Sequence, residues 1–153
     1  PVSPRLHQTM RDIEMALGCS LDWQAATITL SPDAASKSVS VSEKFTGARA
    51  HYDLLLRRML QAQLSLTLFP FAGLGANAAE RLTFIGVRMA VLKLALACAH
   101  AMHGALPQDE QIRVAQSLSR LLDHLGDAAF SLSIFRETGW DQEARLSGVL
   151  ASV

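Results

Sequence analysis

Two neighbouring segments decide the fold, ERLTFIGVRMAVLKLALACAHAMHG (residues 80–104) and QDEQIRVAQSLSRLLDHL (residues 108–125). On a helical wheel, the apolar residues of the first segment cover nearly the whole circumference. That pattern is typical of a helix buried on all sides, because a surface helix keeps one polar face. We therefore expect a central, nearly all-apolar helix over about residues 76–103, stopped by Gly104.

The second segment predicts an amphipathic helix. From Val114 and Leu118 onwards, apolar residues recur at spacings of four and three, which gives one stripe that faces a core. Pro107 suits the first position of a helix, and the acidic residues Asp109 and Glu110 suit its first turn. Two such helices joined by a short turn indicate an all-α fold.

The first fifty residues show weaker helical patterns than the two segments above. Pro4 and Gly18 bracket a helix with apolar residues at helical spacing. Residues 20–30 contain β-branched residues without an evident partner strand, and Ser31–Ser42 is rich in serine and alanine, which predicts a mobile linker. We expect an N-terminal helix and linker over residues 1–42, followed by a single helical-bundle domain over residues 43–153, with about five or six helices in all.

Composition excludes several classes of protein. Lys and Arg together number 14, as do Asp and Glu, so no basic stripe is present for nucleic-acid binding. Half of the residues are hydrophobic. The long apolar segment would suit a membrane span by length, but Arg88 and Lys93 lie on different sides of it, and each costs about 2.5–3.5 kcal/mol at the bilayer centre. We expect no membrane span.

The two cysteines, Cys19 and Cys98, lie far apart in the sequence. Neither belongs to a motif of a disulfide framework or of a metal site. Cys98 lies inside the apolar segment, where a free cysteine behaves as a small hydrophobic residue. Cytoplasmic localisation fits this usage best.

A polar ridge borders the leucine stripe of the second segment. Arginine binds carboxylates and phosphates bidentately, so such a ridge is suited to hold an anionic group or a peptide backbone. The alternative is an ordinary solvated face with local ion pairs. The candidate substrate-binding residues on this ridge are Arg113, Gln116, Ser117, Arg120 and His124.

No catalytic constellation is recognisable, so the catalytic residues stay unknown. Nucleophile-elbow, dinucleotide-binding, phosphate-loop and zinc-protease motifs are all missing from the sequence. His100 and His103 lie three residues apart, but a metal site needs three or four ligands, and two histidines at a helix end also interact favourably with the helix dipole. We expect no metal site here.

The chain resembles the C-terminal part of the flagellin lysine-N-methylase family. The family has a helix that ends near a small residue, an acidic turn, and a helix reading roughly I-x-x-x-Q-S-x-S-R-x-x-x-H. The segment Leu66–Phe71 is also similar to the family's LFPF-like break, and the resemblance covers roughly Tyr52 to Leu150. The second helix matches at Ile112, Gln116, Ser117, Ser119, Arg120 and His124.

The resemblance implies a function for the parent protein. The family transfers methyl groups to lysine side chains of flagellin, with S-adenosylmethionine and a 4Fe–4S cluster held by an N-terminal cysteine-rich motif. This sequence lacks that motif, and iron–sulfur clusters normally take four thiolates. The resemblance thus implies a C-terminal helical domain without a cofactor of its own, which docks flagellin or completes the active-site wall. Its partners would be flagellin and the N-terminal part of the same polypeptide.

A second function class stays open on the residues alone. An all-round apolar helix also suits a non-enzymatic interaction or dimerisation module, or a domain that binds a small apolar ligand.

Overall fold

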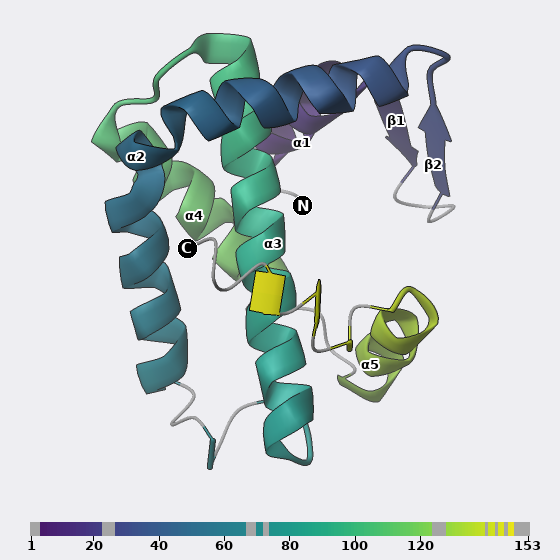
Figure 1. The fold of residues 1–153 in the computed structure, drawn as a ribbon, viewed down its shortest axis with the longest axis vertical. Coiled ribbons are helices and arrows are strands. Elements are labelled where there is room, and N and C mark those ends of the chain that lie inside the picture. The colour runs from purple at the N-terminus through teal and green to yellow at the C-terminus, as the bar shows by residue number, and fades with distance from the viewer. Residues whose placement is uncertain are drawn as a thin grey trace. The chain divides into compact units, whose positions relative to one another are not determined.

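The computed structural model describes residues 4–22, 27–66, 70–71, 74–123, 128–139, 141–142, 144–145 and 147–148. Within these residues the chain forms five helices and one two-stranded sheet (Figure 1). The all-α class expected from the sequence is confirmed. In chain order, the elements are α1 (Pro4–Leu17), β1 (Cys19–Asp22), β2 (Thr27–Leu30), α2 (Ala34–Leu66), α3 (Ala78–His103), α4 (Gln108–Asp123) and α5 (Ala128–Glu137).

The predicted helix ends agree with the structure where glycine and proline set them. Gly18 follows α1 with a φ of 63°, and Gly104 follows α3 with a φ of 78°. Both values lie in the left-handed region that glycine reaches without a steric penalty, so each residue ends its helix. Pro107 directly precedes α4, and its carbonyl accepts the N–H of Gln111 at 3.1 Å.

The expectation of a mobile linker over Ser31–Ser42 is wrong, because α2 begins at Ala34. Asp33 is the N-cap of α2, since its carbonyl accepts the N–H of Lys37 at 3.1 Å and the two side chains pair at 3.0 Å. The hydroxyl of Ser31 binds the Asp33 carboxylate and lowers the pKa of that carboxyl, with a further contribution from Lys37. The expected division between residues 42 and 43 therefore falls inside a helix.

Residues 20–30, ambiguous in the sequence, form an antiparallel hairpin. Cys19 pairs with Leu30, and Leu21 pairs with Ile28. Directly opposed residues of a hairpin share a face, so these four apolar side chains lie on one face and the polar residues lie on the other. The backbone N–H of Leu21 donates to the Glu14 carboxylate at 2.8 Å, which ties β1 to α1.

The chain divides into two compact units. Unit 1 comprises Pro1–Tyr52 and Leu92–Leu118, and unit 2 comprises Asp53–Val91 and Ser119–Val153. The divisions lie within α2, α3 and α4, so each of these helices contributes one part to each unit.

The core of unit 1 is built around the C-terminal part of α3. Leu96 and Cys98 are fully buried, as is Tyr52 of α2. Small residues between them, such as Ala95 and Ala99, are also buried, so neighbouring elements can approach the backbone of α3 closely. The nearly all-apolar composition of this segment thus identified the main core helix of this unit correctly.

The core of unit 2 uses the N-terminal part of α3. Ile85 and Met89 are almost completely buried, and Leu56 of α2 is fully buried. The rings of Phe84 and Phe135 meet edge-to-face, with 5.4 Å between their centroids. Arg136 of α5 pairs with Glu80 at 3.0 Å. Unit 2 therefore combines an aliphatic core with an aromatic contact to α5.

Among the described residues, α3 alone has the length and composition of a membrane-crossing helix, and 61% of its most apolar stretch is buried inside the protein. The core helix of a globular protein has the same properties.

Candidate functional site

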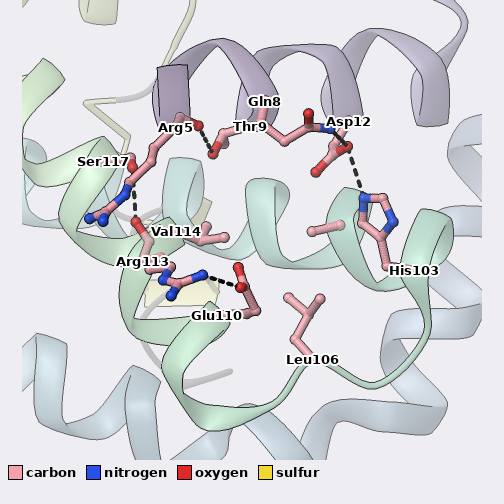
Figure 2. A pocket seen from close by; sticks show the side chains of 11 residues that line it. Arg5, Gln8, Thr9, Asp12, His103, Leu106, Glu110, Arg113, Val114 and Ser117 are labelled. Carbon is pink, nitrogen blue, oxygen red and sulfur yellow. Dashed lines mark hydrogen bonds and ion pairs between the residues drawn. The ribbon is translucent and has the colours of Figure 1, made fainter. Parts of the chain in front are cut away.

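A polar cleft of about 180 Å³ lies in unit 1 (Figure 2). α1 forms one wall with Arg5, Gln8 and Asp12. The end of α3 and the first half of α4 form the others, and they contribute His103 and Arg113. Segments that are a hundred residues apart in the sequence thus meet at one cleft.

Asp12 is the most deeply buried charged group of the cleft, with 6% of the residue exposed. Its Oδ1 accepts two hydrogen bonds of 3.0 Å, one from the amide of Gln8 and one from Nε2 of His103. Gln8 reaches Asp12 because residues four apart lie on the same face of a helix. The other carboxylate oxygen, Oδ2, points into the cleft (Figure 2), and no described residue donates a hydrogen bond to it.

The α4 wall carries a local ion-pair network. The guanidinium of Arg113 binds the Glu110 carboxylate and lies 3.9 Å from that of Asp109. The buried hydroxyl of Ser117 donates to the carbonyl of Arg113 at 2.9 Å, one turn earlier in the helix. Arg113 is therefore largely neutralised by its own helix.

The charges of the cleft separate toward its two ends. Figure 2 shows the side chain of Arg5 extending toward Ser117, away from Asp12. Arg5 and Arg113 balance Asp12 and Glu110, so the cleft carries no formal net charge when His103 is neutral. Between the two ends, the buried side chains of Ala99, Leu106 and Val114 line the cleft as an apolar floor.

A hydrogen-bonded cluster, here called the Leu106 cluster, fixes the connection between α3 and α4. The Tyr52 hydroxyl accepts the backbone N–H of Leu106 at 3.2 Å and donates to Nδ1 of His100 at 2.9 Å. The Leu106 carbonyl accepts hydrogen bonds from His51 at 2.6 Å and from the amide of Gln111 at 2.9 Å. Both backbone polar groups of this loop residue are thus satisfied by side chains, as a buried backbone requires.

The candidate substrate-binding residues do not all meet at the cleft. Arg113 and Ser117 line it, and Gln116 is exposed on the same helix. Arg120 is exposed and belongs to unit 2, and His124 lies outside the described residues. The ion pairs of Arg113 agree with the alternative of a solvated face, whereas its position at the cleft agrees with a binding role.

The α1 residues of the cleft were missed in the sequence. Asp12 lies next to the apolar stripe of Met10 and Ile13, and a carboxylate beside a buried stripe is a weak signal of a buried polar group. The two histidines at the end of α3 have separate partners, because His100 binds Tyr52 and His103 binds Asp12. No three potential metal ligands gather among the described residues.

The two cysteines do not fit an iron–sulfur cluster. Burial raises the pKa of the Cys98 thiol to about 12, with smaller contributions from Cys19 and Asp12. Burial, and then the charge of Glu14, raise the pKa of the Cys19 thiol as well. A 4Fe–4S cluster normally takes four thiolates, and this sequence holds two cysteines.

A larger and more apolar groove, of about 490 Å³, lies in unit 2. Apolar side chains of α2 and α3 dominate its walls, with Met59 and Phe84 among them, and Arg81 is one of its polar lining residues. Arg81 is held in place because its Nε donates to the carbonyl of Gly75 at 3.1 Å.

By its fold, the chain is an all-α helical protein, and its described residues form a polar cleft and an apolar groove. No family model, curated protein or solved structure matches it.

Proposed function

We propose that this chain is the C-terminal helical part of a flagellin lysine-N-methylase, and that it docks the substrate or completes the active-site wall. The observation that carries the proposal is the position of Arg113 and Ser117, two of the candidate substrate-binding residues, at the polar cleft of unit 1. The resemblance of the Gln116–Arg120 segment to the family supplies the reaction and the partner.

The cofactor chemistry is assigned to the rest of the parent protein. This sequence holds two cysteines, Cys19 and Cys98, whereas an iron–sulfur cluster normally takes four thiolates. We therefore assign the 4Fe–4S cluster and S-adenosylmethionine to the N-terminal part of the full-length enzyme, and a binding role to this chain.

Docking predicts that the isolated chain binds monomeric flagellin and that arginine variants bind it less tightly. Arg113→Ala and Arg120→Ala should each weaken binding about tenfold, because a hydrogen bond to a charged group contributes about 1.5–3 kcal/mol. Isothermal titration calorimetry measures the dissociation constant. Arg11→Ala is the matched control. It removes the same positive charge from an exposed residue of α1. Equal losses in all three variants, or no saturable binding by the native chain, would contradict docking.

The apolar groove of unit 2 favours a second candidate function, the binding of a small apolar ligand. Its volume of about 490 Å³ lies within the usual range of about 300–1,000 Å³ for ligand pockets. Met59 adds an adaptable wall, because methionine side chains fill irregular spaces.

This second candidate predicts that 1-decanol raises the melting temperature of the chain. A ligand at one hundred times its dissociation constant stabilises the folded state by about 2.7 kcal/mol. Ala62→Phe fills the groove and should abolish the shift, whereas Ala50→Phe, at an exposed position of the same helix, should preserve it. Differential scanning fluorimetry measures the effect. An unchanged melting temperature of the native chain at saturating decanol would exclude this function.

A further inference from the structure

The carboxylate of Asp12 has one oxygen engaged and one oxygen directed into the cleft. Oδ1 already accepts from Gln8 and His103, both at 3.0 Å, and Oδ2 receives no hydrogen bond from a described residue. The side chain is 8% exposed, and Asp12 lines the cleft, so Oδ2 is reached from the cleft. A carboxylate oxygen accepts hydrogen bonds, and a charged donor forms the strongest ones.

We propose that the cleft between α1 and the α3–α4 connection binds a primary alkylammonium group, with the ammonium on Oδ2 of Asp12. An ammonium supplies three donors and no acceptor, so it matches a single free carboxylate oxygen. Its alkyl stem lies over the apolar floor formed by Ala99, Leu106 and Val114. Alkyl stems of lysine side chains cover apolar surface in this way while the charged head keeps its polar contact.

The geometry favours an ammonium over the other cations of proteins and over anions. A guanidinium binds carboxylates best through two parallel hydrogen bonds, and Oδ1 of Asp12 is already occupied. A divalent metal ion would need more ligands than the described residues bring together. An anion at the Asp12 end of the cleft would be repelled by the Asp12 carboxylate.

The size of the cleft also limits the ligand. A cavity of about 150 Å³ accommodates benzene, so about 180 Å³ has room for a butylammonium-sized group and little more. The group comes either from a lysine side chain of a peptide or from a free alkylamine. Where the group is a peptide lysine, the inference rests on the proposed docking function of the same cleft. Butylamine tests the ammonium site without flagellin, so the two proposals can fail separately.

Titration of the native chain with matched probes tests the proposal. The probes are n-butylamine, Nα-acetyl-lysine-N-methylamide, and the norleucine and arginine analogues of that amide. Proton–nitrogen correlation spectra follow the backbone amides. We expect both amines to shift the amides of Asp12 and His103, and the norleucine and arginine analogues to bind at least tenfold more weakly. Tighter binding of the lysine amide than of butylamine would assign the site to a peptide lysine, and the reverse would assign it to a free amine.

Variants give a second, independent test. Asp12→Asn keeps the shape and the acceptor for Gln8 and His103 but removes the charge, and it should weaken butylamine binding at least tenfold. Glu43→Gln removes the same charge from an exposed residue of α2 that does not line the cleft, and it should leave binding unchanged. If Asp12→Asn does not fold, the affinities of the lysine and norleucine amides for the native chain still show whether the cleft requires an ammonium group. Equal binding of those two probes, or undiminished binding to a folded Asp12→Asn chain, overturns the proposal.

Discussion

Replacing Leu96 with alanine lowers the free energy of unfolding by about 2–5 kcal/mol, the range for a fully buried leucine whose removal leaves a cavity. Leu96 lies in the C-terminal part of α3 and is 0% exposed. Its neighbours in the helix include Ala95 and Ala99, whose small side chains leave few atoms able to move into the cavity. Urea denaturation followed by circular dichroism measures the change as a lower transition midpoint at constant slope.

Leu94→Ala is the control for this experiment. The same atoms are removed from the same helix, but Leu94 is 42% exposed. Helix propensity changes equally in both variants, so the difference between them isolates burial. We expect the Leu94 variant to lose at most about half as much stability, since less apolar area is returned to water. Equal losses would show that Leu96 does not lie in the core of unit 1.

Removing only the hydroxyl of Tyr52, by Tyr52→Phe, should cost about 1–3 kcal/mol, because one buried and one half-buried polar group lose their partner. The N–H of Leu106 loses its acceptor, and Nδ1 of His100 loses its donor. Thr46→Val is a matched control, because its hydroxyl binds the Ser42 carbonyl of its own helix and is exposed. The control should stay within about 0.5 kcal/mol of the native chain. A Tyr52 variant as stable as the control would contradict the role of the Leu106 cluster.

Because Tyr52 ionises at high pH, it also makes the free energy of unfolding depend on pH. Burial raises the pKa of the phenol, and the hydrogen bond from Leu106 opposes this in part. The unfolded chain loses the phenolic proton near pH 10, whereas the folded chain retains it. Stability is therefore complete below about pH 10 and falls as the pH rises through the folded pKa. Tyr52 is the sole tyrosine, so absorbance at 295 nm reports this group alone, and Tyr52→Phe should lack this part of the loss.

The helices were predictable wherever periodicity and caps agreed. Gly18 and Gly104 ended their helices as expected, and the apolar pattern of α3 identified the main core helix. The start of α2 was missed because serine and alanine carry little apolar signal. There, the cap formed by Asp33, with Ser31 before it and Lys37 after it, determines the start of the helix.

The pairing of the hairpin strands and the α1 wall of the cleft could not be predicted from sequence periodicity. The pairing of Leu21 with Ile28 joins two four-residue segments, each too short to be stable as a lone strand. Likewise, Arg113 and Ser117 were recognisable on their own helix, but no pattern within α4 indicates that α1 lies across the cleft and brings Asp12 to it. Such contacts depend on tertiary packing, which a local sequence pattern does not encode.

The Leu106 cluster also decides where this chain can be engineered. Surface loops usually accept inserted tags or serve as new termini in circular permutants, because their backbone is solvated. The connection at residues 104–107 has the short length and the glycine of such a loop, yet side chains from α2 and α4 hold both backbone groups of Leu106. A tag inserted there would separate Leu106 from these partners. A label is better attached to a side chain substituted for Gly47, an exposed position of α2 where an added Cβ meets no atom within 4 Å.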